Sequence, residues 1–269
     1  MKKQFLLFLF ALLPMLAMAD DSGKCGPNVT YTFDSSTGTL TIQGQGAMDN
    51  YNYYSYYNGS SIQTSTAPWG NYVEQIKEVI IKDGVTSIGN YAFSYCNKLN
   101  SVTIGSGVTT IGSSAFSGCS GLTSVTLLCK EIGTWFSGLT PIKEVVIGNE
   151  VTSIAQQAFA GCTGLQKVYS KVEDVFTINK NTFDTNTYNN AKLYVPVGKK
   201  AVYQDTPWWL NFTNIEEYDY STGIAAQQMG KDVKVVDAYQ LDGQKRNGVQ
   251  RGLNIVRMSD GTTRKVVVK

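Results

Sequence analysis

The chain has 269 residues, with 23 Lys and Arg against 21 Asp and Glu, and it contains no histidine. The lack of histidine excludes Ser-His-Asp and Cys-His catalysis in their usual forms, and most catalytic zinc sites. The balanced charge, without a basic stripe that carries interleaved aromatic residues, argues against a nucleic-acid-binding protein.

Residues 1–19 have the pattern of a secretory signal peptide. Lys2 and Lys3 form a basic start, an apolar run covers 5–16, and "AMA" at 17–19 fits a signal-peptidase site. We therefore expect cleavage before Asp20 and export of the chain. The apolar run is too short to remain as a membrane span, and no later run approaches that length, so we expect no transmembrane helix after signal removal.

Residues 20–66 are predicted to form an N-terminal β cap. Val29, Tyr31 and Phe33 alternate with polar residues, a "DSSTG" turn follows, and Leu40 and Ile42 continue the alternation. This pattern predicts a β-hairpin. The residues that follow form a repeat, described below. The open end of a stack of repeats exposes apolar residues and unpaired strand edges, and a hairpin can cover them.

The cap contains a tyrosine-rich stretch, "YNYYSYYNGSS" at 51–61, which has neither a helical nor a strand pattern and is expected to be a loop. Antibody binding loops have a similar composition, because tyrosine gives rigid amphipathic contact area at a low entropic cost. The candidate binding residues are Tyr53, Tyr54, Tyr56 and Tyr57. The alternative is that these rings pack against the cap or belong to an insert without a ligand.

A repeat of about 22 residues dominates residues 67–218. The isoleucines of "VTSIG", "VTTIG", "KEIG" and "VTSIA" lie 23, 21 and 22 residues apart. One unit cannot bury its apolar positions alone, so the units are expected to stack as a β-rich (α/β) repeat solenoid with one continuous core and a C-terminal cap. The predicted core positions are Ile88, Phe93, Cys96, Leu99, Ile111, Phe116, Cys119, Leu122, Ile154, Phe159, Cys162 and Leu165.

Each unit contains a short alternating stretch, as in "LNSVTI", "LTSVTL" and "IKEVVI", which predicts a strand that pairs in parallel with its copy in the next coil. The residues between the core positions are expected to be exposed on the strand face. Solenoids often bind through such a face, although a plain solvated sheet face is the alternative. These candidates are Ser101, Thr103, Ser124, Thr126, Glu144, Val146, Lys167 and Tyr169.

Three cysteines occupy the same repeat position, at Cys96, Cys119 and Cys162. Stacked side chains point in parallel, whereas a disulfide needs converging β-carbons. Leucine takes this position in the unit of Ile132, and buried cysteine behaves as a small apolar residue. These points favour packing over a disulfide, a metal site or catalysis. Cys25 and Cys129 remain, and a bond between them stays open.

The C-terminal part divides into three segments. A cluster of Tyr203, Trp208, Trp209 and Phe212 is predicted to cover the last coil, the alternative being an aromatic platform for a sugar. Residues 219–232 are expected to be a linker. Residues 231–269 carry nine Lys and Arg against four Asp and Glu, and the alternating strands and Asp-Gly turns of 233–269 predict a small β module.

The segment "VTSIGNYAFSYCNKLNSVTI" resembles the repeat of the BspA-like leucine-rich repeat family of secreted bacterial surface proteins, and residues 23–218 as a whole closely resemble that family. "GKCGPNVTYTFDSSTGTLTIQGQGAMDNY" and "LYVPVGKKAVYQDTPWWLNF" resemble the opening and closing modules of that family. The resemblance implies a solenoid with a binding or adhesive role and supplies no catalytic residues. "RGLNIVRMSDGTTRKVVVK" at 251–269 resembles the C-terminal sorting domain of the type IX secretion pathway, or forms a small β cap or dimerisation piece.

The resemblance, together with the signal peptide and the repeat, implies an exported, cell-surface adhesin that recognises a host matrix protein, other cells or a glycan. A structural surface scaffold is the alternative. A glycan-active enzyme would need paired carboxylates, but the adjacent pairs at 173–174 and 216–217 are expected to point apart on a strand. We expect no enzyme activity, no cofactor, no metal and no nucleic-acid partner.

Overall fold

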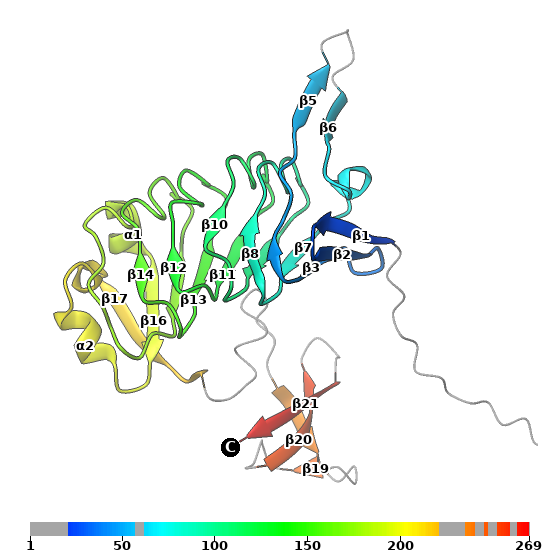
Figure 1. Ribbon diagram of the computed structural model, residues 1–269. Helices are drawn as coiled ribbons and strands as arrows, with labels where there is room; N and C mark the ends of the chain where they lie inside the picture. The colour runs from blue at the N-terminus through cyan, green and yellow to red at the C-terminus, as the bar shows by residue number, and fades with distance from the viewer. Residues whose placement is uncertain are drawn as a thin grey trace, which may run out of the picture.

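The structure, a computed structural model, describes residues 21–56, 62–220, 235–239, 245–246, 252–258 and 263–268 (Figure 1). The predicted signal peptide and most of the predicted linker lie outside these residues. Within the described residues, no helix is long and apolar enough to cross a membrane.

A ten-stranded sheet runs the length of the solenoid, in the order β1-β2-β3-β7-β9-β11-β13-β15-β16-β17. The first three strands pair antiparallel, and from β3 onward every pair is parallel. The prediction of stacked parallel strands behind an N-terminal hairpin is confirmed. The strands are β1 Asp21–Gly26, β2 Val29–Asp34, β3 Thr39–Gly44, β7 Glu78–Ile81, β9 Ser101–Ile104, β11 Ser124–Leu127, β13 Glu144–Ile147, β15 Lys167–Ser170, β16 Lys192–Pro196 and β17 Asn214–Tyr218.

The register of this sheet explains the repeat length. Val102 pairs with Val79 on one side and with Val125 on the other, so identical repeat positions lie side by side. Strand side chains alternate between faces, and the second and fourth residues of each four-residue strand point inward. Val102 and Ile104 are accordingly buried.

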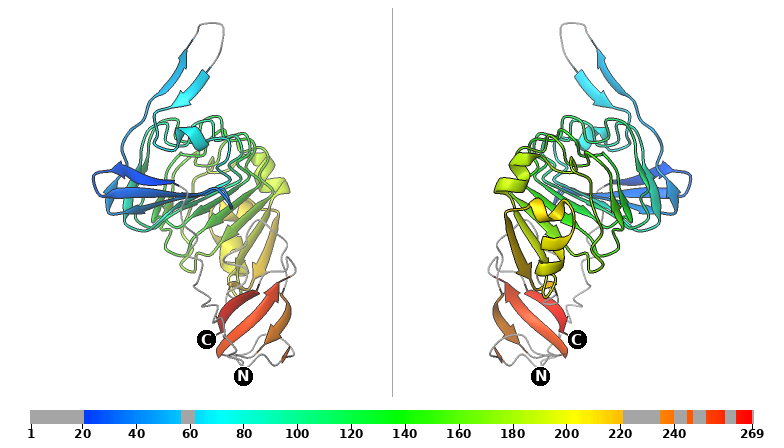
Figure 2. Two further views of the ribbon diagram at one scale, coloured as in Figure 1. Left: turned by 90° about the vertical axis from the view of Figure 1, so that its right-hand side faces the viewer. Right: turned by 90° about the vertical axis from the view of Figure 1, so that its left-hand side faces the viewer.

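A second line of short parallel strands carries the isoleucines that anchor the repeat. They form two small sheets, ordered β10-β8-β4 and β12-β14. Viewed end-on, the coils follow one another along the axis (Figure 2), and the buried side chains of successive coils form one continuous cluster. Ile111 is partly buried, whereas Ile88 and Ile154 are buried. These strands are β4 Gly46–Ala47, β8 Val85–Ile88, β10 Thr110–Ile111, β12 Glu131–Ile132 and β14 Ser153–Ile154.

Stacked rings form a column inside the coils. Phe116 lies between Phe93 and Phe136, with ring centroids 5.3 and 5.5 Å away. Trp69 stacks on Phe93 at 5.4 Å at the front of the column, and its indole Nε1 donates to the carbonyl of Ala92 at 2.8 Å. The recurring phenylalanine of "AF" is therefore a core residue in successive coils.

The turn segments explain the glycines of "SGC" and "AGC". The backbone is left-handed at Tyr95, Gly118 and Gly161, with φ of 60°, 75° and 77°, at one shared position of the repeat. Glycine adopts this conformation without a steric penalty. A Cβ at Gly118 would also lie 2.8 Å from the ring of Tyr95 in the preceding coil.

All five cysteines are free and buried. The thiol of Cys119 donates to the carbonyl of Phe93 at 3.1 Å, and that of Cys162 donates in the same way to Phe136. Each thiol thus links its coil to the coil before it. Burial raises the pKa of Cys119 and of Cys162 from 9.0 to about 12, which keeps both thiols protonated.

These pKa shifts predict a loss of stability in alkali. Because burial favours the neutral thiol, the folded chain holds more protons than the unfolded chain between pH 9 and about pH 12. Stability is therefore expected to fall as the pH rises through this window, by on the order of 1 kcal/mol per thiol near pH 10. Urea unfolding near pH 7 and near pH 10 measures the change, and a Cys119→Ala, Cys162→Ala variant should show a smaller one. Equal midpoints at the two pH values would contradict the prediction.

Short helices and aromatic residues cover the C-terminal end of the solenoid. Tyr203, Trp209 and Phe212 are buried, so these rings belong to a lid, while Trp208 is partly buried against the core. The Trp209 indole donates to the carbonyl of Phe176 at 2.8 Å. Trp69 makes an equivalent bond to the carbonyl of Ala92 at the N-terminal end. The helices are η1 Gly70–Tyr72 at the N-terminal end, and α1 Thr185–Asn190, α2 Lys200–Asp205 and η2 Trp209–Asn211 at the C-terminal end.

Residues 53–56 of the tyrosine-rich stretch form one strand of a β-hairpin, so the prediction of a loop without strand structure was wrong for these residues. Strand β5, Tyr53–Tyr56, pairs antiparallel with β6, Ile62–Ser65. Tyrosine and isoleucine favour extended backbone even without strict alternation. The hairpin extends away from the coils in Figures 1 and 2.

The C-terminal module contains a four-stranded antiparallel sheet in the order β19-β18-β20-β21. Its strands follow the alternating stretches of the sequence. They are β18 Val235–Tyr239, β19 Lys245–Arg246, β20 Gly252–Met258 and β21 Thr263–Val268.

Candidate functional site

The outer face of the ten-stranded sheet is the surface formed by the first and third residues of its four-residue strands. Register places these residues in two rows that cross the sheet from coil to coil. One row is Thr39, Glu78, Ser101, Ser124, Glu144, Lys167, Lys192 and Asn214. The other is Thr41, Ile80, Thr103, Thr126, Val146, Tyr169, Tyr194 and Glu216.

The expectation that all eight candidate strand residues are exposed was wrong. Ser124, Val146 and Tyr169 are buried, and the other five are only partly exposed. Neighbouring strands lie about 4.8 Å apart, so the side chains of one row shield one another. Tyr169 is further covered by the ring of Tyr194, which stacks on it at 4.6 Å.

Four tyrosines gather at the C-terminal end of this face, and we call Tyr169, Tyr194, Tyr218 and Tyr220 the tyrosine cluster. Tyr218 meets Tyr169 and Tyr194 edge-on, with centroids 5.7 and 5.6 Å away. Tyr220 lies 5.0 Å from Tyr218, and its hydroxyl donates to the carbonyl of Tyr194 at 3.2 Å. The rings therefore hold one another in place before any ligand arrives.

Paired charges frame the cluster. Lys192 Nζ lies 2.9 Å from a Glu216 carboxylate oxygen and 5.6 Å from the centre of the Tyr194 ring. The hydrogen bond to Glu216 is the main cause that raises the pKa of Lys192, and the charge interaction with Tyr194 adds to it. The ammonium group of Lys192 therefore stays charged. Lys167 pairs with Glu144, also at 2.9 Å.

Burial shifts the pKa values of Tyr218 and Lys171, which lie in or beside the tyrosine cluster. It raises the pKa of Tyr218, and Tyr194 and Asp219 add to that shift. Burial also lowers the pKa of Lys171, whose Nζ lies 5.6 Å from the centre of the Tyr220 ring. The tyrosine cluster is therefore a neutral aromatic surface with lysines beside it.

Three of its four rings were not among the predicted site residues. Only Tyr169 was, together with its neighbours Glu144 and Lys167. A signal was present, because "KVY" at 167–169 recurs as "KLY" at 192–194, and register aligns the two segments. The unit that contains Phe183 and Leu193 departs from the spacing of about 22 residues, so the repeat spacing does not align the two segments.

The remaining predicted residues lie elsewhere. Tyr53, Tyr54 and Tyr56 belong to the β5–β6 hairpin, and Tyr57 lies outside the described residues. Ser101, Thr103, Ser124 and Thr126 form the part of the outer face with small hydroxyl side chains, on β9 and β11.

The adjacent carboxylates do not form a joint site. On β17, Glu216 pairs with Lys192, whereas Glu217 accepts a hydrogen bond from the backbone N–H of Lys200 at 3.3 Å. Glu173 pairs with Lys199 at 3.3 Å. Across the described residues, no group of three or more His, Cys, Asp or Glu side chains is placed to hold a metal ion.

The parallel ladder, the recurring core positions and the covered ends define a leucine-rich repeat solenoid. Residues 69–190 match the family model of the BspA type leucine rich repeat region in six copies. The protein thus carries a BspA-type leucine-rich repeat region.

Two solved structures of bacterial proteins are similar to the chain. A leucine-rich repeat protein from Eubacterium ventriosum is 24% identical with a TM-score of 0.40, over 60% of this chain and 47% of that one. A leucine rich cell surface protein from Faecalibacterium prausnitzii is 18% identical with a TM-score of 0.22, over 64% of this chain and 69% of that one. The chain thus spans about half the length of the Eubacterium protein. No curated protein matches it.

Proposed function

We propose that this protein is an exported, cell-surface adhesin that binds an extracellular protein, either a host matrix protein or a protein of another cell. The observation that carries the proposal is the tyrosine cluster on the outer face. Tyrosine is enriched among the residues that dominate binding energy, because it offers a large, rigid area with a polar tip. A ring held by its neighbours also loses little conformational freedom on binding.

The sequence supports export and surface attachment. Residues 1–19 have the pattern of a signal peptide. We propose that the four-stranded C-terminal module serves as a sorting segment of the type IX kind, because its last strands correspond to the segment that resembles such domains. The alternative is a structural surface scaffold without a specific ligand, and the experiment below separates the two.

The Tyr194→Ala change is expected to weaken binding by about fivefold to thirtyfold, the cost of losing an aromatic anchor of about 1–2 kcal/mol. The measurement is equilibrium binding of residues 20–269 to a panel of immobilised matrix and cell-surface proteins at physiological ionic strength. Val197→Ala is the matched control, because Val197 is 65% exposed and lies next to the end of the same strand. A thermal melt of each variant shows that it is folded.

Three outcomes would count against this proposal. If no matrix or cell-surface protein is retained, the scaffold alternative is favoured. If Tyr194→Ala binds as well as the wild type, the tyrosine cluster is not the contact surface. If binding is instead lost on replacing Tyr53, Tyr54, Tyr56 and Tyr57 with serine, the β5–β6 hairpin is the binding element.

A further inference from the structure

A groove of about 420 Å³ lies where the repeat ends, on the side of the turn segments. Gln157 and Ala160 of the last regular coil form one wall. The other wall is formed by helix α1 with Lys180, Asn181, Phe183 and Asp184. In the regular coils, a short turn carries cysteine and leucine into the core after the phenylalanine. After Phe183 the chain enters α1 instead. The groove lies where the chain departs from the repeat in this way. Its volume falls in the range of about 300–1,000 Å³ that is usual for small-molecule sites.

The lining of the groove is rich in unused hydrogen-bonding groups. The side-chain amides of Gln157, Asn181, Asn189 and Asn211 line it, and none of the four makes a hydrogen bond to another described residue. The amides of Asn90, Asn97 and Asn186, by contrast, are used in bonds between coils. Each free amide offers both donors and an acceptor.

The charges of the groove balance. Asp184 and Lys180 are its two ionisable lining groups apart from the Tyr188 phenol, and their formal charges cancel. One carboxylate oxygen of Asp184 accepts from the backbone N–H of Gly161 at 2.7 Å, which fixes the carboxylate at the wall of the groove. A groove without net charge favours a neutral ligand.

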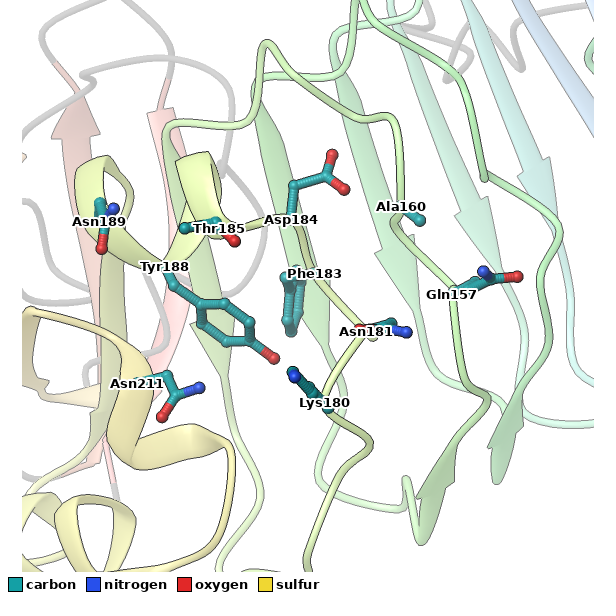
Figure 3. A pocket seen from close by; sticks show the side chains of 10 residues that line it. All are labelled: Gln157, Ala160, Lys180, Asn181, Phe183, Asp184, Thr185, Tyr188, Asn189 and Asn211. Atoms are coloured by element: carbon teal, nitrogen blue, oxygen red, sulfur yellow. The ribbon is translucent and has the colours of Figure 1, made fainter.

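Tyr188 supplies the second, independent observation. Its side chain is 5% exposed, and its ring packs against Phe212 and Phe183, with centroids 5.1 and 5.8 Å away. Its hydroxyl has no hydrogen-bond partner of standard geometry among the described residues, and the backbone N–H of Phe183 makes only a looser contact with it. Figure 3 shows Tyr188 pointing into the groove, toward Lys180. Leaving a buried hydroxyl unpaired costs about 1–3 kcal/mol, and a ligand hydroxyl that displaces the exposed Lys180 side chain would remove that cost.

We infer that this groove binds a neutral sugar unit of an extracellular glycan. Sugar hydroxyls both donate and accept hydrogen bonds, and the free amides, the fixed carboxylate and the Tyr188 hydroxyl match that chemistry. The lining comes from the turn segments, α1 and η2 and shares no residue with the tyrosine cluster. The inference therefore stands whether or not the outer face binds a protein.

Titration calorimetry of residues 20–269 with neutral monosaccharides and disaccharides tests this inference. Tyr188→Phe removes only the hydroxyl, so we expect stability to be kept or raised while sugar affinity falls about tenfold, the equivalent of one hydrogen bond of about 1.4 kcal/mol. Asn181→Ala is expected to weaken binding similarly. Asn149→Ala, an exposed asparagine at another corner, and Tyr194→Ala, on the outer face, should bind as the wild type does.

The salt dependence identifies the ligand class. Binding of a neutral sugar should not change between about 50 and about 500 mM NaCl, because no ion pair is screened. The inference is overturned if no neutral sugar binds at about 10 mM, where even a weak site with a Kd near 1 mM is mostly filled. It is also overturned if only acidic sugars bind in a salt-sensitive way, or if Tyr188→Phe and Asn181→Ala leave the affinity unchanged.

Discussion

Replacing Phe116 with alanine is expected to lower the free energy of unfolding by about 3–5 kcal/mol. The side chain is 3% exposed and stacks between the rings of Phe93 and Phe136. Its loss removes ring contacts on both sides and leaves a cavity between coils. Because each coil is stabilised mainly by its neighbours, the defect weakens the coils before and after it as well.

Urea unfolding followed by circular dichroism measures this effect. Phe116→Leu is the matched control and should cost less than about 1.5 kcal/mol, since it keeps the position apolar and nearly filled. A loss below about 1 kcal/mol for Phe116→Ala would mean that the ring column does not hold the coils together.

Replacing Trp209 with alanine is the second large change, with an expected loss of about 3–5 kcal/mol. Trp209 is 1% exposed, lies 5.3 Å from the ring of Tyr203 and donates its indole N–H to Phe176. The hydroxyl of Tyr203 in turn contacts that of Ser170 at 2.6 Å, which ties the lid to the last regular coil. Without Trp209, the apolar end of the solenoid is open to water.

Leu210→Ala is the matched control for the lid, because Leu210 lies in the same short helix and is 50% exposed. Its effect should stay within about 0.5 kcal/mol. Thermal unfolding of both variants gives the comparison. Similar melting temperatures for Trp209→Ala and the wild type would show that the end of the solenoid is covered by something other than this lid.

The repeat made the interior of the solenoid predictable. Because identical positions stack on one another, the spacing of the isoleucines and of the "AF" pairs defines both the strand register and the buried column. The bonds from Cys119 and Cys162 to the preceding coil were not evident, since spacing shows that a side chain is buried but not which carbonyl it meets.

The surfaces were less predictable, for two physical reasons. Exposure of Ser124 and Tyr169 depends on the size of the side chains in the neighbouring coils, which alternation within one strand does not show. The groove and Tyr194 arise at the last, irregular unit, and Tyr218 and Tyr220 follow it in the C-terminal cap, where the spacing no longer aligns residues. Tyr188 therefore became recognisable only through the helix α1, and the pairing of β16 with β15 is what aligns Tyr194 with Tyr169.

The central claim is that the tyrosine cluster meets an extracellular protein. Hydroxyl-radical footprinting of residues 20–269, free and bound to a retained matrix protein, tests it directly, because oxidation reports the accessibility of each ring. We expect Tyr194 and Tyr218 to be protected in the complex, while Val197 reacts equally in both states. Unchanged oxidation of Tyr194 and Tyr218, with protection confined to the tyrosines of residues 53–57, would contradict the claim.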